Sequence, residues 1–186
     1  MKIALTSIPK SGTHLLATVI ENIVGDYSVT LRKNLDPQSR YARKAIRRQV
    51  VGGHLRISAI MSPNYFPFFQ DRKVIALIRD PRDICNSMIH YIEKSHRIEH
   101  KMLSMALNGL EYDEKICRIA DGINISETNT RIPPIDVSCR GFIEVVDHFT
   151  DSIIIRYEDF FEADIITQKI SNFLEISPDS AHDAVM

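Results

Sequence analysis

A lysine, a serine, a glycine and a threonine stand together near the start of the chain, between an apolar run and a helical pattern. They belong to the sequence Pro9-Lys10-Ser11-Gly12-Thr13-His14. A turn of this kind directs several backbone N–H groups and the positive end of the helix dipole at one point, where a phosphate binds well. The pattern differs from a Walker A loop, because here the lysine precedes Ser-Gly-Thr instead of following a glycine.

A second candidate anion site follows another apolar run. Arg79 ends the run Val74–Ile78, and the next residues, Asp80-Pro81-Arg82-Asp83, predict a helix start with an aspartate cap and an early proline. Ser87 follows Arg79 inside that helix, so both side chains are able to reach one anion at the carboxyl edge of a sheet. Two neighbouring anion sites suit a doubly phosphorylated nucleotide.

Strands and helices that alternate along the chain must position these residues. Apolar runs predict strands at 2–8, 49–52, 74–78 and 152–156, and helical periodicity predicts helices at 14–24, 81–94, 141–149 and 164–174. This alternation favours an α/β fold with a parallel sheet. Residues 95–135 are polar and mixed, so only a short helix or two and loops are expected there.

Composition limits the class of protein. The 186 residues, 44% of them hydrophobic, suffice for one buried core and are too few for two ordinary domains. A formal net charge of -1 argues against a nucleic-acid partner, and no run approaches the roughly 20 apolar residues of a membrane span. The widely spaced Cys85, Cys117 and Cys139 fit neither a disulfide framework nor a zinc cluster, which favours a reducing, cytoplasmic location.

Taken together, the motifs resemble those of the sulfotransferase family, whose members use 3'-phosphoadenosine 5'-phosphosulfate (PAPS). The segment from Pro9 to Thr13 resembles the family's 5'-phosphosulfate loop, and Arg79-Asp-Pro-Arg-Asp83 with Ser87 resembles its 3'-phosphate element. Tyr157-Glu158-Asp159 is similar to a family signature, and we expect it to be structural. The resemblance implies a three-layer αβα domain of the P-loop nucleotide-hydrolase-like class, with a central parallel sheet.

The resemblance also implies roles in the transfer of a sulfuryl group from PAPS to an acceptor hydroxyl or amine. It assigns Lys10 to the leaving phosphate and sulfuryl group, Ser11, Gly12, Thr13 and His14 to the 5'-phosphate, and Arg79 and Ser87 to the 3'-phosphate. The segment Val51-Gly52-Gly53-His54-Leu55 resembles the strand end that carries the family's general base, so His54 is the expected base. Independently, a histidine pKa of about 6.5 suits proton removal near neutral pH. No metal is expected, because Lys10 supplies the positive charge.

Two features depart from the family's pattern. The family continues into an Arg-Lys-Gly segment and a later Gly-x-Trp, and this sequence has no tryptophan. We therefore expect one sulfotransferase-like domain over residues 1–186 without that nucleotide-binding segment. In addition, Gly52 and Gly53 stand where many members have lysine and threonine.

Two alternatives stay open. A small P-loop metabolite kinase would use ATP and magnesium and would require the Gly-Lys-Ser/Thr pattern. A degenerate module would bind the nucleotide without catalysis. In the preferred interpretation the partner is a small-molecule or glycan acceptor, and no nucleic acid or membrane insertion is expected.

Overall fold

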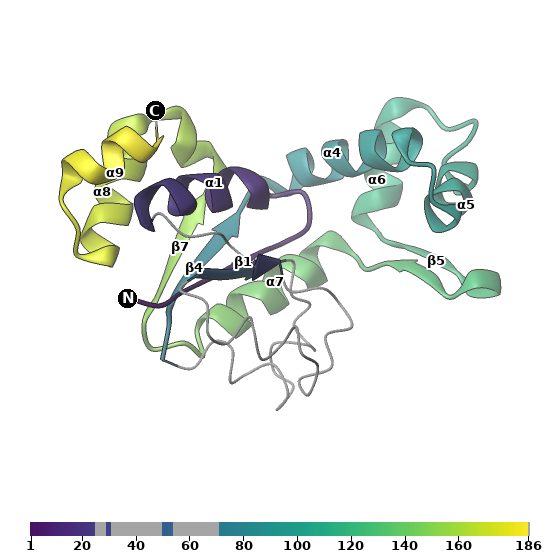
Figure 1. Ribbon diagram of the computed structural model, residues 1–186. Coiled ribbons are helices and arrows are strands. Elements are labelled where there is room, and N and C mark those ends of the chain that lie inside the picture. The colour runs from purple at the N-terminus through teal and green to yellow at the C-terminus, as the bar shows by residue number, and fades with distance from the viewer. Residues whose placement is uncertain (25–28, 31–49, 54–70, 186) are drawn as a thin grey trace. The chain divides into compact units, whose positions relative to one another are not determined.

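A five-stranded parallel sheet is the framework of the protein (Figure 1). The computed structural model describes residues 1–24, 29–30, 50–53 and 71–185. The strands are β1 (Ile3–Ser7), β2 (Val29–Thr30), β3 (Val50–Gly53), β4 (Lys73–Ile78) and β7 (Ser152–Arg156), in the order β2-β3-β1-β4-β7. All of these strands pair in parallel, as the alternation of strands and helices predicts.

Helices cover both faces of this sheet. The helices α1 (Thr13–Val24), α8 (Ala163–Leu174) and α9 (Pro178–Val185) lie on one face, and the part of α7 (Ile135–Val146) that starts at Phe142 lies along the other (Figure 1). This arrangement confirms the predicted three-layer αβα architecture.

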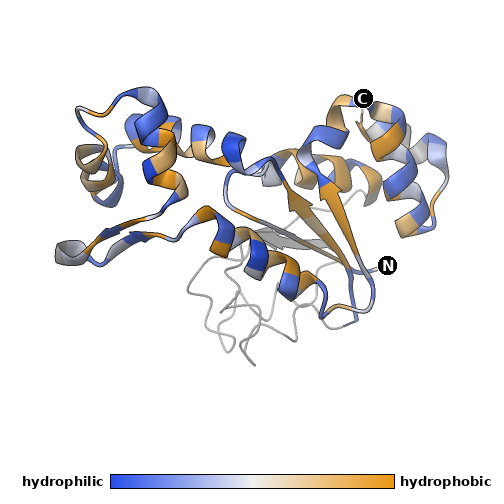
Figure 2. Cartoon of the chain, turned by 180° about the vertical axis from the view of Figure 1, so that it is seen from behind, coloured by the Kyte–Doolittle hydropathy of each residue, from blue (hydrophilic) through white to orange (hydrophobic). Residues whose placement is uncertain are grey.

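The main core lies between the sheet and α1 and α8. All five residues of β1 are buried, as expected for a parallel strand that is covered on both faces. Apolar residues concentrate on the strands of the sheet (Figure 2). On α1, Leu16 and Ile20 are buried, but Leu15, which also belongs to the apolar pattern of the helix predicted at 14–24, is 40% exposed. Leu16, Val19 and Ile20 have the i, i+3, i+4 spacing of one helical face, and Leu15 lies at the edge of that face.

Two compact units make up the described chain. The first contains Met1–Arg79 and Phe142–Met186, and the second contains Asp80–Gly141. The elements of the second unit are α4 (Pro81–Lys94), α5 (Ile98–Ala106), α6 (Tyr112–Ala120), the antiparallel pair β5 (Ile123–Ile125) and β6 (Thr130–Ile132), and the 3-10 turn η2 (Ser126–Thr128) between them. Its own apolar core consists of Cys85, Ile89, Ile92, Leu103, Leu107, Ile119 and Ile123.

The start of α4 is as predicted, and the start of α7 is not. Asp80 Oδ1 accepts a hydrogen bond from the Arg82 N–H at 2.8 Å, which caps α4 in the expected way. In contrast, α7 begins at Ile135, whereas the periodicity placed the helix start at Gly141. The Ser138 N–H donates to the Pro134 carbonyl at 3.0 Å, so the proline opens the helix instead of closing a loop. The pair β5–β6 and the helix α9 were also not predicted.

Candidate functional site

The loop between β1 and α1 turns at two residues with positive φ. Lys10 has φ +72°, which is uncommon for a residue other than glycine, and Gly12 has φ +90°. The Ser11 N–H donates to the Ile8 carbonyl at 3.2 Å, and the Leu16 N–H donates to the Gly12 carbonyl at 3.2 Å. The helix therefore begins directly at the end of the loop, where its first N–H groups have no partner within the helix and suit an anion.

Thr13 and Ser11 differ in their contacts. A hydrogen bond joins the hydroxyls of Ser7 and Thr13, so the start of α1 is tied to the end of β1. Ser11 is completely buried, and its hydroxyl has no hydrogen-bond partner among the described residues. A buried hydroxyl without a partner costs about 1–3 kcal/mol, so an oxygen of a bound anion would be a suitable partner.

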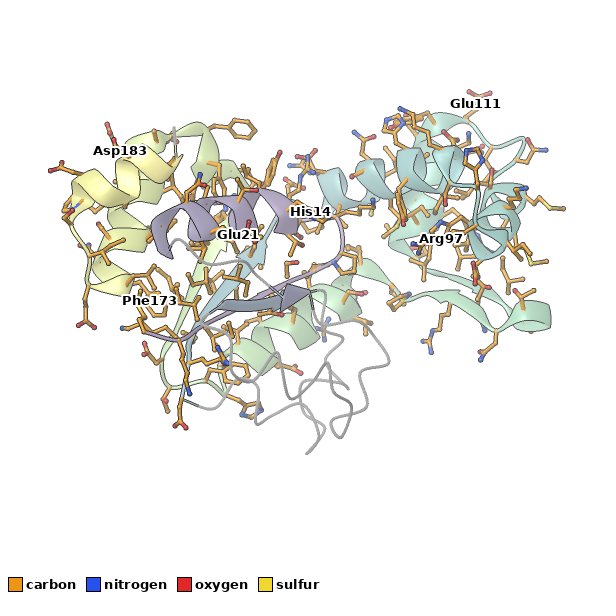
Figure 3. All side chains as sticks on the ribbon, in the orientation of Figure 1. His14, Glu21, Arg97, Glu111, Phe173 and Asp183 are labelled. Atoms are coloured by element: carbon orange, nitrogen blue, oxygen red, sulfur yellow. The ribbon has the colours of Figure 1, made fainter. Side chains whose placement is uncertain are left out.

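Lys10 and His14 differ in their surroundings. Lys10 is half-buried, and this burial lowers the pKa of its ammonium group from the usual 10.5. A neighbouring anion would oppose that shift, because it favours the charged form. His14 is exposed in the first turn of α1, and its carbonyl accepts a hydrogen bond from the Thr18 hydroxyl at 3.0 Å (Figure 3). The backbone N–H of His14 is one of the first N–H groups of α1, which have no partner within the helix.

Arg79 joins this loop from the neighbouring strand. Its Nη1 donates to the Lys10 carbonyl at 3.4 Å, and its Cζ lies 4.4 Å from the centroid of the Tyr157 ring. Arg79 follows β4, and Tyr157 follows β7. Since β1, β4 and β7 are adjacent in the sheet, the three carboxyl ends bring the loop, the arginine and the tyrosine together.

Tyr157 is the residue of this cluster whose position the sequence did not reveal. A Cβ atom added to Gly12 would lie 2.5 Å from Tyr157 Cδ2, so only glycine fits beside the ring. The ring also contacts Phe160 and Phe161, with centroid separations of 6.5 and 5.7 Å. An aromatic residue directly after an apolar strand is the signal that points to such a position.

Asp159 fixes the turn that presents Tyr157. This 3-10 turn, η3 (Tyr157–Phe161), follows β7. Asp159 Oδ2 accepts hydrogen bonds from the Arg156 N–H at 2.9 Å and from Lys169 Nζ of α8 at 2.6 Å. The Asp159 side chain is only 14% exposed, so the ion pair with Lys169 is shielded from water on the carboxylate side.

Replacing Asp159 with alanine is expected to lower the free energy of unfolding by about 1.5–3 kcal/mol, the range for hydrogen bonds to charged groups. The Arg156 N–H and the Lys169 ammonium both lose their acceptor in this variant. Urea unfolding would measure the change, with the exposed Asp147→Ala as the control. A loss within the roughly 0.5 kcal/mol of an ordinary surface substitution would contradict this assignment.

Ser87 and His54 are the other predicted site residues. Ser87 lies half-buried in α4 of the second unit, so its joint action with Arg79 stays a prediction. His54 lies outside the described residues. β3 ends at Gly53, which is in register with Thr6 of β1. In the part of the chain that the structure describes, no group of three histidine, cysteine or acidic side chains is suited to a metal ion.

The three cysteines form no disulfide bond among the described residues. Cys85, Cys117 and Cys139 are free thiols, and burial raises the pKa of the Cys85 and Cys139 thiols. None of the described helices has both the length and the apolar character needed to cross a membrane.

A parallel αβα sheet with a tight turn between its first strand and its first helix is typical of a P-loop-like fold. The model of the sulfotransferase domain family matches residues 1–185, so the chain belongs to that family. This confirms the predicted family and fold class. No curated protein sequence gives a significant match to this chain.

Three solved structures share the fold. Mouse sulfotransferase SULT7A1 complexed with PAP has a TM-score of 0.67 and 21% identity, and the match covers 100% of this chain and 64% of the other. Retinol dehydratase in a complex with retinol and PAP has a TM-score of 0.59, 14% identity and coverages of 99% and 63%. A sulfotransferase from Alicyclobacillus acidocaldarius has a TM-score of 0.58, 14% identity and coverages of 96% and 82%. The chain thus spans less than two thirds of the length of the first two proteins.

Proposed function

We propose that this chain transfers a sulfuryl group from PAPS to an acceptor hydroxyl or amine. The observation that carries the proposal is the hydrogen bond from Arg79 to the Lys10 carbonyl. It joins the loop expected to bind the 5'-phosphosulfate to the arginine expected to bind the 3'-phosphate. Family membership supports the same reaction, and two of the similar structures are complexes with PAP, the product that PAPS leaves after transfer.

In the proposed reaction, the acceptor oxygen or nitrogen attacks the sulfur of PAPS. The new bond to sulfur forms as the bond between sulfur and the 5'-phosphate oxygen breaks, and PAP leaves with that electron pair. His54 accepts the proton of the acceptor, and Lys10 neutralises charge on the sulfuryl and leaving oxygens. β3 ends at Gly53 beside Thr6, and His54 is the next residue in the chain, which supports a role at the edge where the loop lies.

The nucleotide is held by groups of two kinds in this proposal. The hydroxyl of Ser11 and the N–H groups at the start of α1, including those of Thr13 and His14, bind the 5'-phosphate. Arg79 and Ser87 bind the 3'-phosphate as charged and hydroxyl donors. The buried Ser11 hydroxyl supports this arrangement, because a phosphate oxygen would satisfy it.

We also propose the domain organisation, the kind of acceptor and the cellular location that go with this reaction. Both compact units form one sulfotransferase-like domain, which the family match over residues 1–185 supports. The acceptor is a small molecule or a glycan, and the location is cytoplasmic. The three free thiols support a reducing compartment. No metal takes part in the proposed chemistry, since Lys10 provides the charge.

Calorimetric titration with PAP, without magnesium, tests the nucleotide. We expect a micromolar dissociation constant, or about -8 kcal/mol, and binding of ATP at least about 10-fold weaker. Adenosine 5'-monophosphate is the matched ligand, because it lacks only the 3'-phosphate, and it should also bind more weakly. Absence of PAP binding would contradict the proposal and favour a degenerate module. A preference for ATP with magnesium would favour a kinase.

A further inference from the structure

The short helix α5 has apolar side chains on two opposite sides. Leu103 is buried in the core of the second unit, whereas Ile98 and Met105 are 74% and 73% exposed. Successive helical residues lie about 100° apart, so Leu103 lies roughly opposite both of them. Ile98, the partly exposed Met102 and Met105 have the i, i+4, i+7 spacing of one helical face, which we name the outer face of α5. Apolar side chains gathered on the exposed side of a helix indicate a docking surface.

The inner side of α5 is fixed against α4. Leu103 and Leu107 pack in a buried cluster that includes residues of α4. His100 Nδ1 lies 2.6 Å from the Ser95 hydroxyl oxygen, and the Tyr91 ring of α4 meets the His100 ring edge-on, with a centroid separation of 4.8 Å. The helix therefore cannot rotate to bury its outer face without losing these contacts.

Basic residues accompany the outer face. Arg97 and Lys101 are exposed and lie four residues apart at the start of α5, and Lys94 is exposed at the end of α4 (Figure 3). None of these three cations takes part in an ion pair with another described residue. Glu99 is the one acidic residue in the sequence from 94 to 105. The surface thus combines an apolar face with net positive charge, which is complementary to an anionic partner.

The outer face offers too little area for a stable protein interface. Such an interface buries about 800 Å² on each partner, and the outer face consists of three side chains on a helix of nine residues. A second copy of the chain would also bring two surfaces of net positive charge together, and like charges repel. The occupant must therefore be extended, anionic and able to accept apolar side chains without a shaped groove.

A lipid bilayer with anionic head groups has all of these properties. We propose that the outer face of α5 binds the surface of such a bilayer, with its apolar side chains among the head groups and with Arg97 and Lys101 beside the anionic lipids. The helix lies on the surface and does not cross the membrane, in agreement with its length of nine residues. The proposal is separate from the proposed function, because it assigns no step of sulfuryl transfer to α5.

Co-sedimentation with sucrose-loaded vesicles tests binding to lipid. The chain should bind vesicles of phosphatidylcholine with about 30% phosphatidylserine at least about 10-fold more tightly than vesicles of phosphatidylcholine alone. Raising the sodium chloride concentration from about 0.1 to about 0.5 M should weaken this binding, because salt screens the charges. No binding, or equal binding to both kinds of vesicle, would overturn the proposal.

Two double variants test the location of the cations. Arg97→Gln with Lys101→Gln should weaken binding to the anionic vesicles by about 10–30-fold, the loss expected for two cations next to an anionic surface. Arg118→Gln with Arg131→Gln is the matched control, because it removes the same charge from two exposed arginines elsewhere in the second unit, and its loss should be clearly smaller. Equal losses would show attraction by overall charge alone, contrary to a docking face on α5.

A further pair of double variants tests the apolar side chains. Ile98→Ser with Met105→Ser should weaken binding to the anionic vesicles by at least about 10-fold, because two apolar side chains no longer leave water. Val137→Ser with Ile143→Ser removes two other exposed apolar side chains, on α7, and should leave binding unchanged. Urea midpoints of unfolding should match the wild type, since all four positions are exposed. Wild-type binding by the α5 variant would refute the proposal, and if that variant does not fold, the charge variants still decide.

Sedimentation equilibrium tests a second copy of the chain as the occupant. The wild type and Ile98→Ser with Met105→Ser should have the same mass in solution. A wild-type dimer that this double variant dissociates would assign the outer face to a second copy, and would overturn the proposal. None of these measurements needs a nucleotide, so they decide the role of α5 whether or not PAP binds.

Discussion

Replacing Lys10 with methionine is expected to slow sulfuryl transfer by about 10²–10³-fold, the loss that follows removal of one group that stabilises developing charge. Methionine keeps much of the aliphatic stem of this half-buried side chain and removes the ammonium group. PAP release from PAPS would be followed with an acceptor on which the wild-type chain is active, screened from phenols, alcohols, amines and sugars. A loss below about 5-fold would remove Lys10 from the stabilisation of the leaving group.

Control variants and pH make the Lys10 result specific. Lys101→Met, an exposed lysine on α5, should transfer at the wild-type rate. Burial lowers the pKa of Lys10 in the free protein, and a bound anion should raise it. PAP affinity should therefore fall as the pH rises through the pKa of free Lys10, below 10.5, with proton uptake on binding. The Lys10→Met variant should lack this alkaline decrease in calorimetric titrations.

Replacing His54 with alanine is expected to slow transfer by about 10²–10⁴-fold, the usual contribution of a general base. PAP affinity should remain, because the proton that His54 accepts belongs to the acceptor and not to the nucleotide. Rates and PAP titrations of the same preparation would separate the two effects, with the exposed His148→Ala as the control. An unchanged rate would exclude His54 as the base, and a parallel loss of PAP affinity would indicate a role in nucleotide binding instead.

The sequence predicted the elements whose signals are local. β7 covers Ser152–Arg156 and α4 covers Pro81–Lys94 at the expected bounds, because a β-branched run and an Asp-Pro helix start depend only on neighbouring residues. The hairpin was missed because the pairing of Ile123 with Ile132 joins strands of only three residues each. Such short strands have too few residues to show an alternating pattern.

Some residues of the candidate site have a local signal in the sequence, and others do not. The Lys10–Thr13 loop and Arg79 follow recognisable strand ends, and the structure brings Arg79 against the Lys10 carbonyl. The contact between Tyr157 and Gly12 depends on β7 lying next to β4, and the order of strands in a sheet is not written in any local pattern. Tyr157 was therefore interpreted only as part of a structural turn.

The strand order has a consequence for how the chain matures during synthesis. Val74 of β4 pairs with Ser152 of β7, so the whole Asp80–Gly141 unit leaves the ribosome before β4 obtains its second neighbour. Until then, the nascent β4 presents an open strand edge, which is the kind of surface that pairs with other chains. The loop and Arg79 are made early, but Tyr157 arrives only after β7. The edge of the sheet that carries the loop therefore becomes complete only after β7 has been made.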